Sequence, residues 1–154
     1  MFLIKEFQES ESKALICLLN EQFKDNGWKK ENEENLDKRV ISCLQAQEAK
    51  QLILLLAIDH NATVVGYVLI QWLKELWTDF PEAFISSFYV RALFRQKGVG
   101  TLLLEAAIKE VRKRNCMRLF LENNRENSIY EKKFYPKRGW KERTDVSIFE
   151  FPTK

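Results

Sequence analysis

The spacing of apolar residues in the first half of the chain predicts strands and helices in succession. Residues 2–7 alternate apolar and polar side chains, which is typical of a short strand. Residues 51–59 form an apolar run bounded by a turn, and residues 63–72 are rich in β-branched side chains, so both stretches also predict strands. Between the first two strands, apolar residues recur every three or four positions, which predicts two helices, the second over about 33–49.

A strand, a helix and another strand follow in the second half. Residues 73–83 are long for a hairpin loop and carry aromatic and acidic side chains. A strand is expected over 84–90, an amphipathic helix over 99–114 and a further strand over 117–122. A strand–helix–strand crossover of this kind implies a parallel pair of strands.

The C-terminal residues predict a last helix and a pair of strands. A helical pattern over 127–140 turns at Gly139, and residues 140–151 are expected to form a closing hairpin around Thr144 and Asp145. Since the early hairpins imply antiparallel pairing, we expect an α/β (α+β) protein with a mixed, mostly antiparallel central sheet and one βαβ crossover.

Composition and charge narrow the class of protein. The chain has 45% apolar and 31% charged residues, as soluble globular proteins do, and residues 1–154 contain no repeat or linker, so a single domain is expected. A net charge of +3 is small for a nucleic-acid binder, and no stretch approaches the ~20 apolar residues of a membrane span. Three scattered cysteines and an N-terminus unlike a signal peptide favour the reducing cytoplasm. The single histidine, His60, lies in an expected turn, and no Cys/His cluster has zinc spacing, so no metal is expected.

Two of the five glycines, Gly98 and Gly100, stand where a helix is about to begin. Glycine is costly inside a helix, so its presence there needs a reason. A strand, a turn carrying Arg95 and Lys97, and a helix start form an arrangement that binds phosphate, because the first turn of a helix has free N–H groups. The alternative is that the glycines only permit a tight turn. The spacing matches neither the dinucleotide nor the P-loop fingerprint and leaves both interpretations open.

The segment FYVRALFRQKGVGTLLLEAAIKE, residues 88–110, resembles motif A of the GNAT-type N-acetyltransferases. In that motif a strand leads to R/Q-x-x-G-x-G/A at the start of a helix, and residues 95–100 match every defined position. The downstream FYPKRGW, residues 134–140, is similar to the family's F-Y-x-x-x-G-F, with Trp140 in place of the final Phe. The order of elements is also the family's. The resemblance covers nearly the whole chain, is weakest in the N-terminal third, and implies the GNAT fold with helices on both faces of the sheet.

The resemblance implies acetyl-CoA as cosubstrate, an amine as acceptor and no metal. The pyrophosphate would lie over backbone N–H groups of residues 96–101. The pantetheine arm would run between the strands 84–90 and 117–122 and pair with the backbone of Phe88 and Val90, where a bulge splays the strands and an N–H near Val90 polarises the thioester carbonyl. The residues implied in cofactor binding are Phe88, Tyr89, Val90, Arg95, Gln96, Lys97, Gly98, Val99, Gly100, Thr101 and Asn127.

The family's proton donor to the departing thiolate is a tyrosine of the F-Y motif, which corresponds to Tyr135. Two departures accompany it: Pro136 should end or kink the helix, and the family's Asn, seven residues before the tyrosine, falls on Ser128 with Asn127 beside it. Tyr130 is a competing candidate. Five positions are about 140° around a helix, so only one of the two tyrosines could face the thiol. The spacing to the downstream Gly-Trp favours Tyr135.

The attacking amine must be neutral, so a general base is also expected. Glu122, at the end of the 117–122 strand, is the first candidate, and Glu82, Ser86 and Ser87 are others. Aromatic and acidic residues in the 72–82 loop and the 31–37 region suit a cationic amine through charge and cation–π contacts. The alternative is that these acids are solvated, while Trp77 and Phe80 pin the loop to the core.

These features favour an acetyl-CoA-dependent N-acetyltransferase that acts on a primary amine of a small cationic molecule, by direct attack in a ternary complex. Two alternatives stay open: acetylation of a protein or peptide amine, and a non-catalytic module that binds acyl-CoA. The expected partner is a small-molecule amine, with no nucleic acid and no membrane. The sequence leaves open whether the chain forms a homodimer.

Overall fold

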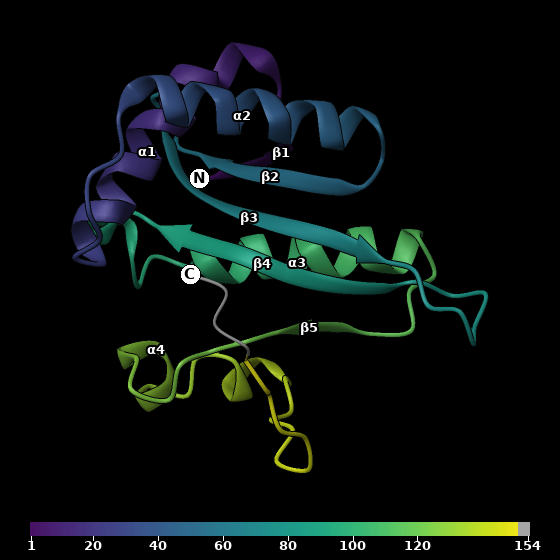
Figure 1. The fold of residues 1–154 in the computed structure, drawn as a ribbon. Coiled ribbons are helices and arrows are strands. Elements are labelled where there is room, and N and C mark those ends of the chain that lie inside the picture. The colour runs from purple at the N-terminus through teal and green to yellow at the C-terminus, as the bar shows by residue number, and fades with distance from the viewer. Residues whose placement is uncertain (151–154) are drawn as a thin grey trace. The chain divides into compact units, whose positions relative to one another are not determined.

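The computed structural model describes residues 1–150, and Figure 1 shows how helices and strands follow one another. Contacts within the chain divide it into two compact units, Met1–Leu121 and Glu122–Lys154. With short 3₁₀ helices written η, the first unit contains β1 (Leu3–Glu6), η1 (Glu9–Glu11), α1 (Ser12–Asp25), α2 (Glu33–Glu48), β2 (Leu52–Ile58), β3 (Val64–Leu73), β4 (Glu82–Val90), η2 (Ala92–Phe94), α3 (Val99–Lys113) and β5 (Leu119–Leu121). The second contains α4 (Ser128–Glu131) and η3 (Pro136–Arg138).

The strands of the first unit form one five-stranded mixed sheet in the order β1-β2-β3-β4-β5. The first four strands pair antiparallel with their neighbours, whereas β5 returns through α3 and pairs parallel with β4. The expected mixed, mostly antiparallel sheet with a βαβ crossover is therefore confirmed. The last strand is shorter than the expected 117–122, because only Leu119–Leu121 pairs with β4.

Helices cover both faces of this sheet. Successive residues of a strand point to opposite sides, so two neighbouring residues of β3 show which helix lies on each face. On one side, Tyr67 of β3 reaches α1, where its hydroxyl donates to Gln22 Oε1 at 2.6 Å. Its neighbour Gly66 faces the other side, where a Cβ atom would come within 3.3 Å of Leu103 on α3. Figure 1 shows α3 passing behind β4. The crossover helix thus packs on the face opposite α1.

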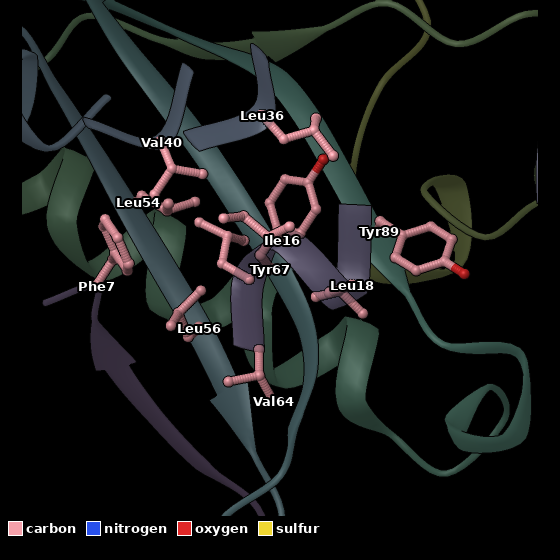
Figure 2. Packing of buried hydrophobic residues seen from close by; sticks show 11 residues of the cluster. Phe7, Ile16, Leu18, Leu36, Val40, Leu54, Leu56, Val64, Tyr67 and Tyr89 are labelled. Carbon is pink, nitrogen blue, oxygen red and sulfur yellow. The ribbon is translucent and has the colours of Figure 1, made fainter. Parts of the chain in front are cut away.

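The core between the sheet and α1–α2 consists of large aliphatic side chains, one phenylalanine and two tyrosines (Figure 2). Leu18 and Leu56 are completely buried, and Phe7 is 1% exposed. Leu36 and Val40, one turn apart on α2, face the same cluster, as helical periodicity predicts. This packing fixes α1 and α2 on the sheet.

In the second unit the helix is shorter than expected. The α4 helix covers four residues, because Lys133 adopts a φ of 52°, in the left-handed region where helices commonly end. The helix therefore ends before Pro136, and the proline instead occupies the first turn of η3, where its fixed φ is favourable. The predicted turn at Gly139 is confirmed by a φ of 81°.

The predicted closing hairpin over 140–151 is wrong for the described residues: 140–150 contain no strand, and Phe151 lies outside them. A two-residue hairpin turn requires positive φ at its central residues, and the Thr144–Asp145 pair lacks the glycine or asparagine that favours it. A lone two-stranded hairpin is also marginal in water. Asp145 instead holds Arg143 through two contacts of 2.7 Å, which stabilise a local bend.

Candidate active site

A β-bulge interrupts β4 near its middle. Leu69 of β3 pairs with Ser87, whereas the next residue, Ile70, pairs with Ile85, so Ser86 is an extra residue in β4. The parallel pairing with β5 also ends at Ile85. The bulge that the resemblance implies is thus present, at the point where the ladder between β4 and β5 stops.

Beyond the bulge, alternate residues of β4 direct their backbone groups away from β3. The Arg91 N–H donates to the Val65 carbonyl at 2.9 Å, which identifies the hydrogen-bonded positions of this antiparallel ladder. Alternation along the strand then turns the backbone of Tyr89 toward β3, and the N–H and C=O groups of Phe88 and Val90 toward the opposite edge. The two residues expected to pair with pantetheine therefore present their backbone on one edge.

The connection from β4 to α3 places a left-handed glycine directly before the helix. Gly98 has a φ of 84°, which favours glycine, and Gln96 also lies in the left-handed region with a φ of 61°. The first helical hydrogen bond runs from the Leu102 N–H to the Gly98 carbonyl at 3.0 Å. The N–H groups of Val99 and Gly100 precede that bond, at the positive end of the helix dipole.

This turn offers a diphosphate a helix N-terminus and a basic side chain. A Cβ atom on Gly98 would meet nothing within 4 Å, so glycine is not needed there to avoid a clash inside the described chain. The 15-residue α3 supplies a helix N-terminus, which attracts anions. Lys97 is exposed, with its Nζ 5.3 Å from the Phe94 ring centre, and Thr101 lies in the first turn of the helix. The residues present therefore fit a coenzyme pyrophosphate.

Arg95, the first residue of the RQKGVG motif, points back to β4. Its Nε donates to the Val90 carbonyl at 2.9 Å, its Nη2 contacts Asp25 Oδ2 at 2.8 Å, and its guanidinium lies 5.5 Å over the Tyr89 ring. The Tyr89 hydroxyl donates to the same Asp25 oxygen at 2.8 Å. Burial is the main cause that raises the pKa of the Tyr89 hydroxyl, and the Asp25 carboxylate raises it further. The hydroxyl therefore stays protonated at neutral pH.

Two of the candidate bases are already engaged in other contacts. Ser87 Oγ lies 2.6 Å from the Tyr67 hydroxyl, which also binds Gln22 in the core. Glu82 is 8% exposed and binds Arg118 through both carboxylate oxygens, at 2.8 and 2.9 Å. The Arg118 guanidinium therefore occupies both oxygens of the Glu82 carboxylate, which are not open to a substrate amine.

In the second unit, Tyr135 packs between two aromatic rings. Its ring centre lies 5.1 Å from that of Phe134, edge-on, and 5.8 Å from that of Trp140. The Tyr135 hydroxyl makes no hydrogen bond within the described residues. Burial raises its pKa to about 12, so it remains protonated and able to donate at neutral pH.

Tyr130 differs from Tyr135 in its hydrogen bonding. Its hydroxyl lies 3.2 and 3.1 Å from the two carboxylate oxygens of Glu142, which also binds Arg125 at 2.8 Å. The expectation that helical rotation separates the two tyrosines is wrong, because the left-handed Lys133 interrupts the helix between them. The two hydroxyls differ instead in their hydrogen bonds: that of Tyr130 binds a carboxylate, and that of Tyr135 does not.

Asn127 and Glu122 lie in the same unit as these tyrosines. Asn127 is the N-cap of α4, where its Oδ1 accepts the Ile129 N–H at 2.9 Å. Ser128, the other candidate for the family's asparagine, is the first residue of that helix. Glu122 is exposed and makes no hydrogen bond or ion pair within residues 1–150.

The loop between β3 and β4 is exposed rather than packed on the core. Trp77 is 78% exposed and Phe80 46%, so the alternative in which these residues pin the loop is wrong. The loop is short of apolar neighbours because it connects two strands at the end of the sheet. Trp72 lies just before it, and one face of its ring is occupied by the Arg114 guanidinium at 4.3 Å.

Two of the acids expected near an acceptor are neutralised by basic side chains of α2. Glu31 pairs with Arg39 and Glu34 with Lys38, both at 2.6 Å. A hydrogen bond from Asn35 is the main cause that lowers the pKa of Glu31. These pairs leave less negative charge for a cationic ligand than the sequence alone suggests.

Sequence reasoning missed a groove of about 570 Å³ at the end of α1. Within the described residues, Asn20 Oδ1 is buried without a hydrogen-bond partner. Trp28 is 56% exposed, and its ring lies edge-on to Phe23 at 5.6 Å. In the sequence, this groove could have been inferred from Trp28, which comes directly after the Asp-Asn-Gly helix stop. The groove is lined by Asn20, Glu21, Phe23, Lys24, Gly27, Trp28 and Lys30.

Residues 1–150 lack the features of two other classes of site. No group of three or more His, Cys, Asp or Glu side chains in this part of the chain is arranged to hold a metal ion. None of its helices combines the length and the apolar character needed to cross a membrane. The three cysteines are free thiols.

Comparisons with known proteins agree with this geometry. Among models of protein families, the acetyltransferase (GNAT) family matches residues 13–140. No curated protein sequence matches the chain. Solved structures with the same fold include a probable acetyltransferase, 17% identical with a TM-score of 0.84 over 99% of this chain and 98% of that one.

Two further structures are described as complexes. AAC(6')-Iy in complex with the bisubstrate analog CoA-S-monomethyl-acetylneamine is 19% identical, with a TM-score of 0.78 over 99% of both chains. The aminoglycoside acetyltransferase meta-AAC0020, from an uncultured soil metagenomic sample and in complex with sisomicin, is 18% identical, with a TM-score of 0.76 over 99% of this chain and 97% of that one. At these identities the likeness concerns the fold, and the family is given by the sequence match over most of the chain. The chain belongs to the GNAT family of acetyltransferases.

Proposed function

We propose that the protein transfers an acetyl group from acetyl-CoA to a primary amine of a small cationic molecule, with residues 1–154 acting as one catalytic domain. A cytoplasmic location is proposed with it, supported by the three free thiols. The observation that carries the proposal is that β4 is bulged near its middle and leads, through η2, to a left-handed glycine at the start of α3. A strand edge and a helix N-terminus in succession suit an extended pantetheine arm joined to a pyrophosphate.

In this proposal the coenzyme is held mainly by backbone groups. The N–H groups from Gln96 to Thr101 receive the pyrophosphate, and the outward edge at Phe88 and Val90 pairs with the pantetheine amides. Acetyl-CoA supplies an acetyl group activated as a thioester. The Val90 N–H, which points to that edge, hydrogen-bonds the thioester oxygen and stabilises the negative charge that develops there.

Tyr135 is the proposed general acid. The amine nitrogen forms a bond to the acetyl carbon as the carbon–sulfur bond breaks, and the departing sulfur takes the hydroxyl proton of Tyr135. Support comes from the hydroxyl, which has no hydrogen-bond partner within the described residues. Burial raises its pKa to about 12, so the hydroxyl carries its proton at neutral pH. Asn127, next to the family's asparagine position, is retained as a coenzyme contact.

Glu122 is the proposed base that accepts the proton of the amine, directly or through water. The other candidates support this choice, because Glu82 is bound by Arg118 and Ser87 by Tyr67. Glu122, in contrast, is exposed and has no partner in residues 1–150. A carboxylate without a protein partner is open to contact with the substrate amine or with a bridging water.

Measuring thiol release from acetyl-CoA tests the proposal. The acceptors would be a polyamine, an aminoglycoside, a lysine-containing peptide and a peptide with a free N-terminus, and each would be followed by mass spectrometry of the product. We expect turnover on the small cationic amines and little on the peptides. Turnover on a peptide alone would move the acceptor to protein amines. Tight coenzyme binding without turnover on any amine would indicate a non-catalytic acyl-CoA-binding module.

A further inference from the structure

The last residue of α1, Asp25, ties this helix to the connection between β4 and α3. Its Oδ2 accepts hydrogen bonds from Tyr89 Oη and from Arg95 Nη2, both at 2.8 Å. Arg95 in turn donates through Nε to the Val90 carbonyl at 2.9 Å. The three contacts join the end of α1 to the last residues of β4 and to the turn that follows.

These contacts hold Arg95 rigidly. A guanidinium donates its N–H groups in a fixed planar fork, so two bonds to different partners fix its orientation. The Arg95 backbone N–H also donates to the Ala92 carbonyl at 3.2 Å. Backbone and side chain are thus both held one residue before Gln96, where the chain enters its first left-handed position at a φ of 61°. The direction in which the chain leaves Arg95 determines where the N–H groups of the glycine turn lie.

We propose that Asp25 is a positioning residue for the coenzyme site. Through Arg95 it holds the Val90 carbonyl and the turn at 95–98 in the conformation that receives the pyrophosphate. The inference rests on the proposed function and deepens it, because it makes Arg95 part of a clamp rather than a direct ligand of phosphate. The Asp25–Arg95 pair has no net charge, so its contribution to coenzyme binding is geometric.

The two possible roles of Arg95 give opposite results when Asp25 is removed. If Arg95 is part of a clamp, loss of Asp25 loosens the turn and coenzyme A binds more weakly. If Arg95 binds phosphate directly, loss of Asp25 frees a positive charge, and coenzyme A binds more tightly. The sign of the change in affinity therefore separates the two roles. The Asp25 side chain is 32% exposed and that of Arg95 50%, and exposed ion pairs contribute little to global stability, so the variants should fold.

The first experiment is calorimetric titration of coenzyme A into the wild type, Asp25→Ala, Arg95→Ala and the double variant. We expect each single variant to raise the Kd about tenfold, equivalent to ~1.4 kcal/mol, and the double variant to bind no more weakly than Arg95→Ala. Glu21→Gln is the matched control, because it breaks another ion pair from α1, to Arg91 at 3.1 Å, without touching Arg95. Its Kd should change less than about twofold. Tighter or unchanged binding by Asp25→Ala, or an equal loss in Glu21→Gln, overturns the inference.

The second experiment needs no ligand. Amide hydrogen exchange of Phe94, Arg95 and Leu102, all hydrogen-bonded around the turn, should be several-fold faster in Asp25→Ala than in the wild type, while exchange at Val40 on α2 is unchanged. Equal exchange rates at the turn overturn the inference whether or not coenzyme A binds. A wild type that binds no coenzyme A refutes the proposed function and the coenzyme role of Asp25, while the exchange rates still decide whether the clamp holds the turn.

Discussion

Gly66 of β3 lies so close to β4 that a Cβ atom on it would sit 2.8 Å from the backbone carbonyl oxygen of Tyr89. The same atom would come within 3.3 Å of Leu103 on α3 and of Val90 on β4. The side chains could shift by a few tenths of an ångström, but the Tyr89 carbonyl belongs to the sheet. Glycine at this position therefore lets α3 pack closely behind the end of β4.

Gly66→Ala should lower the free energy of unfolding by roughly 1–3 kcal/mol, the usual cost of forcing an extra carbon into a packed interior. Urea denaturation followed by circular dichroism would measure the change. Gln71→Ala, at an exposed position of the same strand, is the control and should stay within about 0.5 kcal/mol of the wild type. A Gly66→Ala protein as stable as the control would contradict this account of the packing.

Two substitutions of Gly98 should distinguish the stability cost of a strained backbone from the loss of coenzyme affinity caused by an added side chain. Gly98→Ala puts a Cβ on a residue with a φ of 84° and should cost about 1–2 kcal/mol of stability, whereas asparagine tolerates the left-handed region better. Both variants should bind coenzyme A at least tenfold more weakly, because either side chain enters the space that we propose for the pyrophosphate. Calorimetry together with thermal melts would check both effects. Wild-type affinity in Gly98→Asn would show that the pyrophosphate lies elsewhere.

Replacing Tyr135 by phenylalanine should reduce kcat about a hundredfold, since a positioned general acid contributes at least this much. The affinity for acetyl-CoA should change little, because the ring and its contacts with Phe134 and Trp140 are kept. Tyr130→Phe is the matched control and should retain most of its kcat, as its hydroxyl binds Glu142. Steady-state kinetics would decide, and the opposite ranking of the two variants would move the acid to Tyr130.

Stability at high pH should report the environment of Tyr135. Its folded pKa of about 12 exceeds the ordinary tyrosine value of about 10, so folding favours the protonated hydroxyl. The associated stability is complete below about pH 10 and is lost as the pH rises toward 12. Thermal melts of the wild type and Tyr135→Phe between pH 8 and 11.5 would test this. The wild type should lose stability relative to the variant only above about pH 10; parallel curves would mean that the hydroxyl is not buried.

Tyr67→Phe should destabilise the protein by roughly 1–3 kcal/mol, because it leaves the buried Gln22 without its hydroxyl donor. Ser87→Ala removes only the other contact of that hydroxyl, so its cost should be smaller. Chemical denaturation would give the ranking. Ser87→Ala should also keep its kcat, and a large loss of turnover would return Ser87 to the list of candidate bases.

The first unit is close to what the sequence predicts, because its strands and helices are long enough for apolar periodicity to identify them. The glycine turn was also recognisable, since glycine often marks a residue with positive φ, as at Gly98. Contacts between distant positions were not. Asp25 and Arg95 are 70 residues apart, and no local pattern encodes their ion pair. The end of α4 was missed for a different reason: lysine is a good helix former, so the left-handed conformation of Lys133 has no signature in the sequence.

The bulge in β4 has an implication for how such a site can arise. Ser86 is a single surplus residue: Ile85 opposite Ile70 and Ser87 opposite Leu69 would be adjacent partners in a regular ladder without it. Deleting that one codon would leave every other strand pairing in register and would remove the interruption beside which the ladder to β5 stops. An unbroken antiparallel strand and a bulged strand beside which the ladder to β5 stops are therefore one insertion apart, so such an opening needs no rebuilding of the core.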